Sequence, residues 1–382
     1  MKKKETRVGR FFRLCPVRHC IVILSGLLVA FHFLTRNDRA LCAKVSDSFV
    51  RHVHVALAKV FSVFPFSGAE FLIYGAVLFA LIYLIVQIVL LIRRPEKGKR
   101  AWRALMTFAA LGLAVWGLFG LLWGTYYYGD DFAAKSGMKQ ENVTPEQLAA
   151  VTEYFADVVN TYAPQVARDD RGICAIDKKS VLERSAHLYD NVRQTYPFLY
   201  GPDVPVKALT VLGSKIQTHA NYTGFFFPLT GEANVNTDFP STQFAATVAH
   251  ELAHQRGVAK EQEANFMAVV ASFASGDPDF TYSSAVMAFV YCHNALYEAD
   301  RDAHARIWGL LCEEAKLDLE NDRLYWEPYQ ENNPVKEVTD AVYEDFLEGY
   351  GQELGLKSYG ACVDYLVSYF YEDAAAHLGL GE

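Results

Sequence analysis

The chain has 382 residues, of which 52% are hydrophobic and 21% charged, a composition that excludes a disordered or fibrous protein. Its formal net charge of -8 argues against a nucleic-acid-binding protein. The charge is unevenly distributed, because residues 1–125 contain 18 Lys and Arg against 5 Asp and Glu, whereas residues 126–382 contain 18 against 39. We therefore expect two parts in different surroundings and no nucleic-acid partner.

Two long apolar runs without a charged residue, 71–92 and 104–124, predict membrane-spanning helices. At about 1.5 Å per residue, each run is long enough to cross a hydrocarbon core of about 30 Å. Neither run has the polar face that a helix of a soluble protein would need. A shorter run, 20–34, follows seven basic residues and fits either a retained spanning helix, which we favour, or a cleaved signal peptide.

Basic residues indicate the orientation of these helices in the lipid bilayer. The N-terminal tail and residues 93–103 are both rich in Lys and Arg, which favours the cytoplasmic side. We therefore expect a multi-pass protein of the cell membrane with a cytoplasmic N-terminus, a membrane domain over 1–125 and an extracytoplasmic domain over 126–382. Residues 44–64 have an amphipathic pattern, which predicts a helix that lies in the membrane interface on the outer side or packs on the spanning helices.

The acidic part has the pattern of a globular domain with many helices and few strands. Thr144, followed by Pro145 and Gln147, predicts the start of a helix that extends to about residue 162. Strands are predicted at 204–212, 223–228 and 231–236. Further helices are predicted at 179–196, 242–256, 259–275, 283–311, 335–354 and 358–377. The fold class is therefore mostly α, with three transmembrane helices followed by an α+β domain.

The residues His250-Glu251-Leu252-Ala253-His254 form an HExxH motif inside a helical stretch. Residues four positions apart lie on the same side of a helix, so the imidazoles of His250 and His254 can bind one metal ion. Glu251 lies beside the first ligand, where it can hold a water molecule on the metal and accept its proton. Glu251 is therefore the expected catalytic residue.

A zinc ion normally takes a third protein ligand and keeps one position open for water. Two glutamates that follow the motif, Glu261 and Glu263, are near enough in the sequence to supply it. Glu261 and Asn265 are one helical turn apart, so Glu261 can bind the metal while Asn265 supports a ligand imidazole. Glu263 would point away from that side, and we therefore favour Glu261. Imidazole and carboxylate ligands suit Zn²⁺ best, which makes it the expected cofactor.

This arrangement resembles that of the gluzincin metallopeptidases, in which a second helix supplies a glutamate ligand after HExxH. More closely, the chain resembles an uncharacterised bacterial multi-pass membrane family with a zincin-like domain. The resemblance rests on Pro65-Phe66-Ser67, Trp123-Gly124, Tyr126-Tyr127, Thr223–Asn236, His250–Gly257, Glu261–Phe266 and Ser358–Gly360. It extends over nearly the whole chain and implies a metal-dependent peptidase fold without a known substrate.

The main hypothesis is a membrane-anchored zinc metallopeptidase that hydrolyses a peptide or protein substrate outside the cytoplasm. The alternative is a non-catalytic peptide-binding sensor, or a cell-envelope scaffold with a structural metal site. By analogy with the related peptidases, 223–228 or 231–236 would be an edge strand that binds an extended peptide, unless its side chains only fill the core. Four residues are candidates for stabilising an oxyanion by their type alone, and the sequence does not choose among them: Tyr222, His219, Tyr291 and His293.

Overall fold

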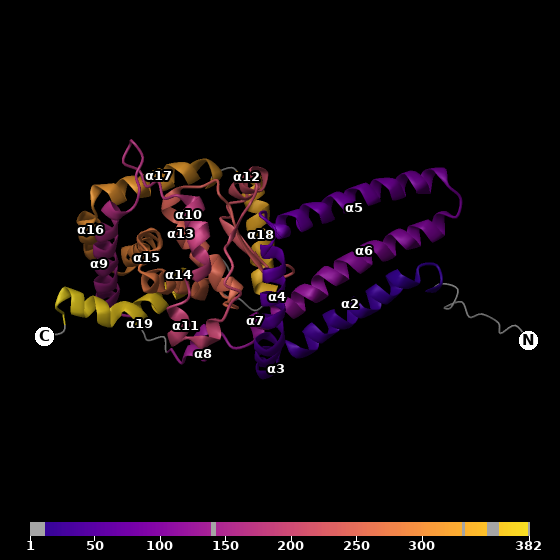
Figure 1. Cartoon of the computed structure of the whole chain (residues 1–382), viewed down its shortest axis with the longest axis horizontal. Coiled ribbons are helices and arrows are strands. Elements are labelled where there is room, and N and C mark those ends of the chain that lie inside the picture. Colours follow the sequence, from indigo (N-terminus) through magenta and orange to yellow (C-terminus); the bar gives the residue numbers. More distant parts are fainter. Residues whose placement is uncertain (1–11, 139–142, 331–332, 350–358, 381–382) are drawn as a thin grey trace, which may run out of the picture. The chain divides into compact units, whose positions relative to one another are not determined.

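The structure, a computed structural model, is mostly helical and contains one small sheet (Figure 1). It describes residues 12–138, 143–330, 333–349 and 359–380. Its internal contacts divide the chain into two units, each built from two segments. The first unit comprises the described part of Met1–Val50 and Gly68–Gly129, and the second comprises Arg51–Ser67 and the described part of Asp130–Glu382.

The first unit contains the three predicted membrane-spanning helices. Its elements are α2 (Pro16–Thr35), α3 (Arg39–Val45), a π-helical turn (Ser46–Val50), α5 (Gly68–Arg93), α6 (Lys97–Phe119), a second π-helical turn (Gly120–Gly124) and α7 (Thr125–Tyr128). By length and composition, α2, α5 and the continuous run from α6 to α7 can cross a membrane, and α2 lies near the N-terminus. Apolar helices of membrane length are thus confirmed at 20–34, 71–92 and 104–124, while their insertion in a membrane and the side on which each loop lies stay predictions.

Two glycines allow the helix of α6 and its continuation to approach α2 closely. A Cβ atom at Gly117 would lie 2.8 Å from the Cβ atom of Leu28, and one at Gly120 would lie 3.0 Å from the ring of His32. A Cβ atom at Gly117 would therefore force its neighbours to shift, and one at Gly120 would require the His32 side chain to move slightly. Small residues at such contacts are typical of helix pairs in membranes, because they allow the two backbones to come together.

The second unit contains the sheet and most of the helices of the chain. Its helices are α4 (Arg51–Ser62), α8 (Phe132–Ser136), α9 (Pro145–Tyr162), α10 (Lys178–Arg184), α11 (Val192–Thr195), α12 (Val211–His219), α13 (Ser241–Gln255), α14 (Glu261–Ser275), α15 (Pro278–Ala299), α16 (Arg301–Leu310), α17 (Glu313–Gln330), α18 (Pro334–Gly349) and α19 (Tyr359–Leu378). Its strands are β1 (Lys207–Ala208), β2 (Gly224–Phe227) and β3 (Glu232–Val235).

The sheet has the strand order β1-β3-β2. β3 runs parallel to β1, with Lys207 opposite Asn234, and antiparallel to β2, with Phe225 opposite Asn234. All four residues of β3 are buried, whereas those of β2 are half-buried. Of the two segments considered for the edge strand, the structure therefore places 224–227 at an edge and 232–235 in the centre.

The strand predicted at 204–212 is wrong over most of its length. Only Lys207–Ala208 pair with β3, and α12 begins at Val211. Pro205 has no main-chain N–H to donate to a ladder, which limits the pairing on that side. Thr210 then starts the helix, because its side chain accepts a hydrogen bond from the main-chain nitrogen of Gly213 at 3.2 Å.

Two predicted helices are interrupted in the structure. The stretch 283–311 is divided between α15 and α16 at Asp300, whose carboxylate accepts hydrogen bonds from the main-chain nitrogens of Asp302 and Ala303. This local cap starts a new helix and ends the continuity of the old one. The stretch 179–196 forms only short helical pieces, α10 and α11, with a 3-10 turn between them.

The remaining helices of the acidic part agree with the prediction. α9 begins with a capping box, in which the Thr144 and Gln147 side chains each bond the other residue's main-chain nitrogen. The predicted helices at 242–256, 259–275 and 358–377 correspond to α13, α14 and α19. The helix predicted at 335–354 corresponds to α18, and its last residues lie outside the described part of the chain. Ser358, the first residue of the helix predicted at 358–377, also lies outside it.

The segment between the first two apolar helices belongs to the second unit. α4 buries the side chains of Arg51, His54 and Ala58, and Ser67 donates a hydrogen bond to Asn234 Oδ1 at 2.6 Å. Residues 44–64 are predicted to form one helix of the membrane domain. The stretch is helical as far as Ser62, but its contacts place Arg51–Ser67 in the second unit. The physical reason is that the buried Arg51 has hydrogen-bond partners far away in the sequence, at Phe198, Tyr200 and Arg256, which an amphipathic pattern does not reveal.

The core of the second unit surrounds α13 and α14 with other helices. α15 packs against α9 and α13, α13 packs against α14 and the sheet, and α19 covers α9 and α14. Large side chains fill this core, among them Phe155, Phe244, Phe266 and Phe289, all at most 1% exposed. The motif helix is therefore held in a fixed apolar surrounding.

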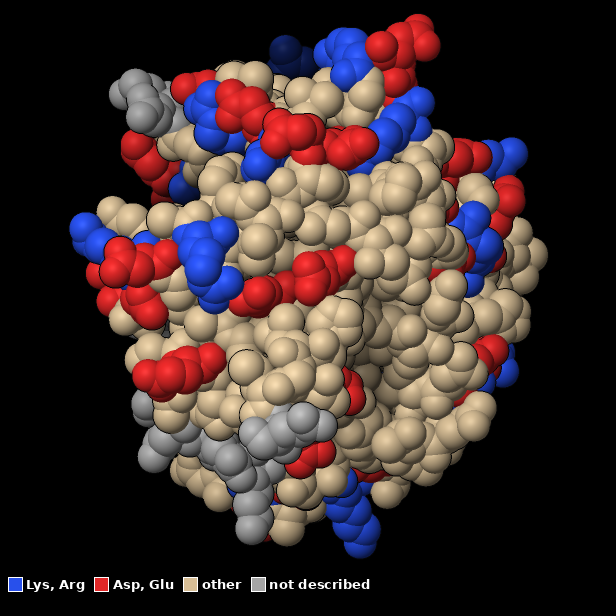
Figure 2. All heavy atoms as spheres, turned by 90° about the vertical axis from the view of Figure 1, so that its left-hand side faces the viewer, with Lys and Arg blue, Asp and Glu red and all other residues tan. Residues whose placement is uncertain are grey.

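The side of the second unit on which α9, α16 and α19 lie in Figure 1 has charges of both signs (Figure 2). Acidic and basic side chains are mixed there, and a wide uncharged area lies between them (Figure 2). Among the described residues drawn on this face there is no continuous basic surface, which is what a nucleic-acid backbone would need. The absence of a nucleic-acid partner stays a prediction.

Asp322, on α17, is a buried carboxylic acid with a testable effect on stability. Burial and the nearby charge of Asp318 raise the pKa of Asp322 to about 7. Between the unfolded pKa of about 3.9 and this value the folded chain binds more protons, so the group lowers stability as the pH rises through that window. We expect Asp322→Asn, which imitates the neutral acid, to stabilise the protein at pH 8 by on the order of 1–3 kcal/mol and far less at pH 4. Thermal unfolding of both proteins in detergent checks this, and an equal shift at both pH values would contradict it.

Candidate metal centre

The HExxH motif lies in the last turns of α13, and a tight turn leads from there into α14. Gly257 has a φ of +82°, a left-handed conformation that glycine adopts without strain. The turn folds the chain back, so that Glu261, at the start of α14, faces the motif helix. Local sequence therefore builds the whole centre from two consecutive helices.

His250, His254 and Glu261 come together at one point. Each offers a ligand atom, and these atoms lie within 4.8 Å of one another. Nε2 of His250 is 3.2 Å from Glu261 Oε2, and Nε2 of His254 is 3.6 Å from Glu261 Oε1. Ligands about 2.1 Å from a tetrahedral zinc ion are about 3.4 Å apart, so this donor set fits such an ion. Among the described residues, no other group of three or more His, Cys, Asp or Glu side chains has this spacing.

Hydrogen bonds orient both imidazoles toward this point. Nδ1 of His250 donates to Asn265 Oδ1 at 2.8 Å, and Nδ1 of His254 donates to the main-chain oxygen of Val258 at 2.7 Å. Because both acceptors are oxygens, the proton of each neutral ring is on Nδ1 and Nε2 keeps its lone pair. The structure thus gives Asn265 the supporting contact that its position relative to Glu261 suggests.

Glu263, the other candidate for the third ligand, points elsewhere. Its Oε2 accepts a hydrogen bond from the main-chain nitrogen of Phe132 at 3.0 Å, and its Oε1 accepts one from the Tyr365 hydroxyl at 3.0 Å. The side chain is 1% exposed and lies between α8, α14 and α19. Glu263 therefore connects helices of the core and is not directed at the two histidines.

Glu251 is buried beside the two histidines, with one oxygen available for chemistry. Among the described residues, its Oε2 has no hydrogen-bond partner. Burial raises the pKa of Glu251 to about 7, against the effect of the neighbouring imidazoles. β2 lies directly against this carboxylate, since a Cβ atom at Gly224 would be 2.6 Å from Glu251 Oε1. Glycine is therefore required there for the close approach of strand and glutamate.

The charges of the three converging groups are strongly coupled. Burial lowers the pKa of His254, but the Glu261 carboxylate outweighs it, and the net pKa of His254 is about 9. Burial opposes ionisation of Glu261, yet the two imidazoles hold its pKa well below the usual range. Glu261 thus stays a negative carboxylate beside the two imidazoles, and the same negative charge would attract a bound cation.

Two tyrosines, Tyr343 and Tyr222, lie next to these groups, and only Tyr222 is among the residues expected from the sequence. The Tyr343 hydroxyl, on α18, donates a hydrogen bond to Glu261 Oε1 at 2.7 Å. The ring of Tyr222 packs edge-on against that of Tyr343, with centroids 5.7 Å apart. Burial, followed by the charges of Asp340 and Glu261, raises the pKa of Tyr222 to about 12. Tyr343 follows Glu261 by 82 positions in an ordinary helical pattern, so no local signal could have identified it.

Two of the other candidates for oxyanion stabilisation have partners of a different kind. His219 bonds the main-chain oxygen of Lys215 and packs on Tyr329. His293 stacks on His304, with ring centroids 3.7 Å apart. Tyr222, another of these candidates, contacts Tyr343, which is hydrogen-bonded to Glu261.

A family model described as "Protein of unknown function (DUF3810)" matches residues 46–367 of the chain. The chain belongs to the DUF3810 family. No curated protein and no solved structure matches it. The DUF3810 match includes α4, α5 and α6 as well as α13 and α14, so the candidate centre and two of the three apolar helices lie inside the family region. The resemblance to an uncharacterised family is thereby confirmed, and the zincin-like activity stays a prediction.

Proposed function

We propose that this protein is a membrane-anchored zinc metallopeptidase that hydrolyses peptide bonds outside the cytoplasm. The observation that supports it is the convergence of His250, His254 and Glu261 within 4.8 Å, beside the buried Glu251, whose Oε2 has no hydrogen-bond partner among the residues that the structure describes. Two imidazoles and one carboxylate, with a fourth direction left for solvent, are the donor set of catalytic zinc sites. A structural site would use four protein ligands.

The proposed chemistry divides between the metal and Glu251. When bound, zinc would polarise the peptide carbonyl and make a water molecule acidic enough to attack it at neutral pH. Glu251 would accept the proton of that water and deliver it to the leaving nitrogen. Burial raises the pKa of Glu251 toward neutrality in the absence of metal, which favours a group that can both accept and release a proton.

The substrate proposed for the centre is an extended peptide held along β2. In the sheet of the described residues β2 pairs with β3 alone, and its first residue touches Glu251. A peptide added to such an edge would form main-chain hydrogen bonds and place its carbonyl groups in a row beside the glutamate. Side chains would then contribute specificity through the residues around β2.

Tyr343 is expected to support this activity by orienting the Glu261 carboxylate. We expect Tyr343→Phe to lower kcat/KM about 10–100-fold, because partners of metal ligands have effects of this size. Peptide hydrolysis by the purified full-length variant checks this. Tyr325→Phe is the matched control, since the Tyr325 hydroxyl donates to the main-chain oxygen of Asp238 away from the centre. Equal losses in both variants would contradict a specific role for Tyr343.

The proposed location of the active site follows from the charge distribution. The basic tail and the basic residues of 93–103 favour the cytoplasm, and an odd number of spans would then put the acidic unit on the other side. Protease added to the outside of intact spheroplasts should digest the acidic unit. Protection of that unit until the membrane is broken would overturn this orientation.

The decisive experiment for the function uses the full-length protein in detergent. We expect about one zinc ion per chain and hydrolysis of peptides that a chelator abolishes and added Zn²⁺ restores. Zinc binding together with tight peptide binding but no cleavage would instead favour the sensor. Absence of bound zinc would overturn the proposal.

A further inference from the structure

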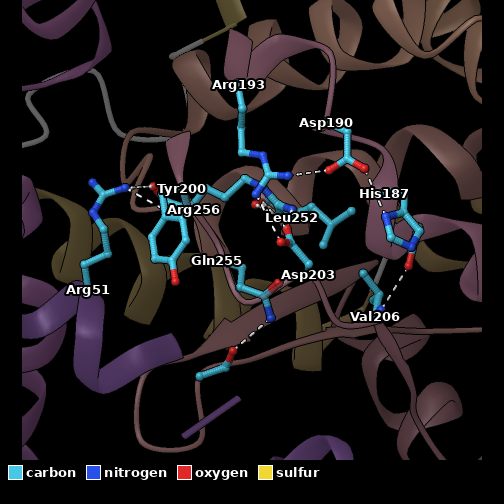
Figure 3. Close-up of polar contacts among 12 residues, drawn as sticks. Arg51, His187, Asp190, Arg193, Tyr200, Asp203, Val206, Leu252, Gln255 and Arg256 are labelled. Carbon is cyan, nitrogen blue, oxygen red and sulfur yellow. Dashed lines mark hydrogen bonds and ion pairs between the residues drawn. The ribbon is translucent and has the colours of Figure 1, made fainter. Parts of the chain in front are cut away.

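The end of the motif helix is joined to a segment from the other end of the chain. Arg51, the first residue of α4, is 8% exposed although its guanidinium is charged. Its Nη1 donates hydrogen bonds to three main-chain oxygens, those of Phe198, Tyr200 at 3.3 Å and Arg256 at 3.3 Å. Figure 3 shows Arg51 beside Tyr200 and Arg256. Main-chain carbonyl groups from two distant segments thus hold a buried cation.

The contact with Arg256 is made where α13 ends. The last carbonyl groups of a helix have no partner inside it, and the helix dipole is negative there. A positive side chain that donates to such a carbonyl satisfies the group and is attracted by the dipole. Arg51 therefore fixes the main chain at the C-terminal end of α13, two residues after His254.

The same turn determines the direction of the His254 ring. Arg256 is followed by Gly257, and then by Val258, whose main-chain oxygen accepts the Nδ1 proton of His254 at 2.7 Å. A shift of the carbonyl of Arg256 would move this oxygen, because both belong to one tight turn. Only the turn Arg256-Gly257-Val258 thus lies between the contact of Arg51 and the hydrogen bond that orients His254, a candidate metal ligand.

A second link connects α4 with the same end of α13. Gln255 donates a hydrogen bond to the main-chain oxygen of Gly231 at 2.9 Å (Figure 3). Gly231 has a φ of +68°, and a Cβ atom there would lie 2.4 Å from the main-chain oxygen of His54. α4 therefore packs directly on the turn that holds Gln255.

The side chain of Arg256 is held independently of Arg51. Its guanidinium lies over the ring of Tyr189, 4.5 Å from the centroid, and contacts Asp203 at 3.5 Å. Arg193 also binds Asp203, at 3.0 Å (Figure 3). Loss of Arg51 would therefore leave the Arg256 side chain anchored and free the main chain, which separates the effect of Arg51 from general unfolding of this region.

We propose that Arg51 is a positioning residue of the metal centre, through which the segment between the first two apolar helices sets the geometry of His254. The proposal rests on the proposed function, since it concerns the metal that the function requires. Lysine cannot replace Arg51 fully, because its ammonium group is a compact charge that binds water more strongly than the guanidinium does and therefore costs more to bury. A soluble fragment that begins after α7 would lack this contact.

The test measures metal binding by the full-length protein in detergent. We expect Arg51→Met to weaken Zn²⁺ binding about 10–100-fold in competition with a chelating dye, and to change the visible spectrum of the Co²⁺-substituted protein. Arg51→Lys should fall between Arg51→Met and wild type. Lys59→Met is the matched control, because Lys59 is an exposed cation of the same helix, and it should bind both ions as wild type does.

Melting curves of the metal-free proteins separate positioning from stability. Wild-type affinity and an unchanged cobalt spectrum in Arg51→Met would overturn the proposal, whatever the change in Tm. If Arg51→Met does not fold, the same two measurements on Arg51→Lys decide the question. A wild-type protein that binds no Zn²⁺ would overturn the proposed function. Zn²⁺ binding by wild type with the same affinity in the Arg51 variants would overturn this proposal alone.

Discussion

Glu251→Gln should retain bound zinc and lose peptide hydrolysis by about 10²–10⁴-fold in kcat, the usual contribution of a general base. The amide has the size of the carboxylate but cannot accept the proton of an attacking water. Glu251 does not contribute to the group formed by His250, His254 and Glu261, so the metal donors would stay in place. The measurement is the initial rate of peptide cleavage together with the zinc content of the same preparation.

A matched control is available for this substitution. Glu153→Gln makes the same chemical change at a residue that pairs with Arg306 at 2.7 Å, on α9 and α16. It should keep both zinc and activity. Hydrolysis by Glu251→Gln within twofold of wild type would rule out the role of Glu251 and would favour a site that binds peptide without cutting it.

Glu261→Ala should weaken metal binding, whereas Glu263→Gln should lower the stability of the protein and leave metal binding unchanged. We expect Glu261→Ala to weaken zinc binding by more than 100-fold, because only two ligands would remain. Glu263→Gln should keep zinc but lower the free energy of unfolding by about 1–3 kcal/mol, since a hydrogen bond of its buried carboxylate to Phe132 or Tyr365 would be disturbed. Chelator competition and thermal unfolding of the full-length variants measure the two effects.

The reverse pattern would identify Glu263 as the ligand. Both variants remove one negative charge from the first turn of α14, so a general electrostatic effect on that helix would appear in both. The Glu261 side chain points to the two histidines, whereas that of Glu263 points to Phe132 and Tyr365. For that reason the pair tests the geometry of the centre and not the charge of the helix.

Arg51 and α4 also decide how the protein must be prepared. The division suggested by the sequence would allow the acidic domain to be produced from residue 126 onward. The second unit, however, includes Arg51–Ser67, which supplies buried groups and the Ser67 contact with Asn234. A fragment without this segment would leave Asn234 and the end of α13 without partners that the complete chain provides.

Features that depend on neighbouring residues could be predicted. The three apolar helices follow from composition, and the capping box of α9 follows from Thr144 and Gln147. The approach of His250 to His254 follows from the period of a single helix, and the choice of Glu261 over Glu263 follows from the period of the next. The errors, such as the strand at 204–212 and the break at Asp300, arose where one capping side chain outweighed a longer pattern.

The sequence by itself therefore determined the membrane-length helices and the two consecutive helices that contain the HExxH glutamate and its metal donors, because their spacing is local. Only the tertiary structure decided that Tyr343 contacts Glu261, that Gly224 brings β2 against Glu251, and that Arg51 holds the end of α13. These contacts join residues up to 205 positions apart. No pattern along the chain encodes them, because they depend on how separate elements pack together.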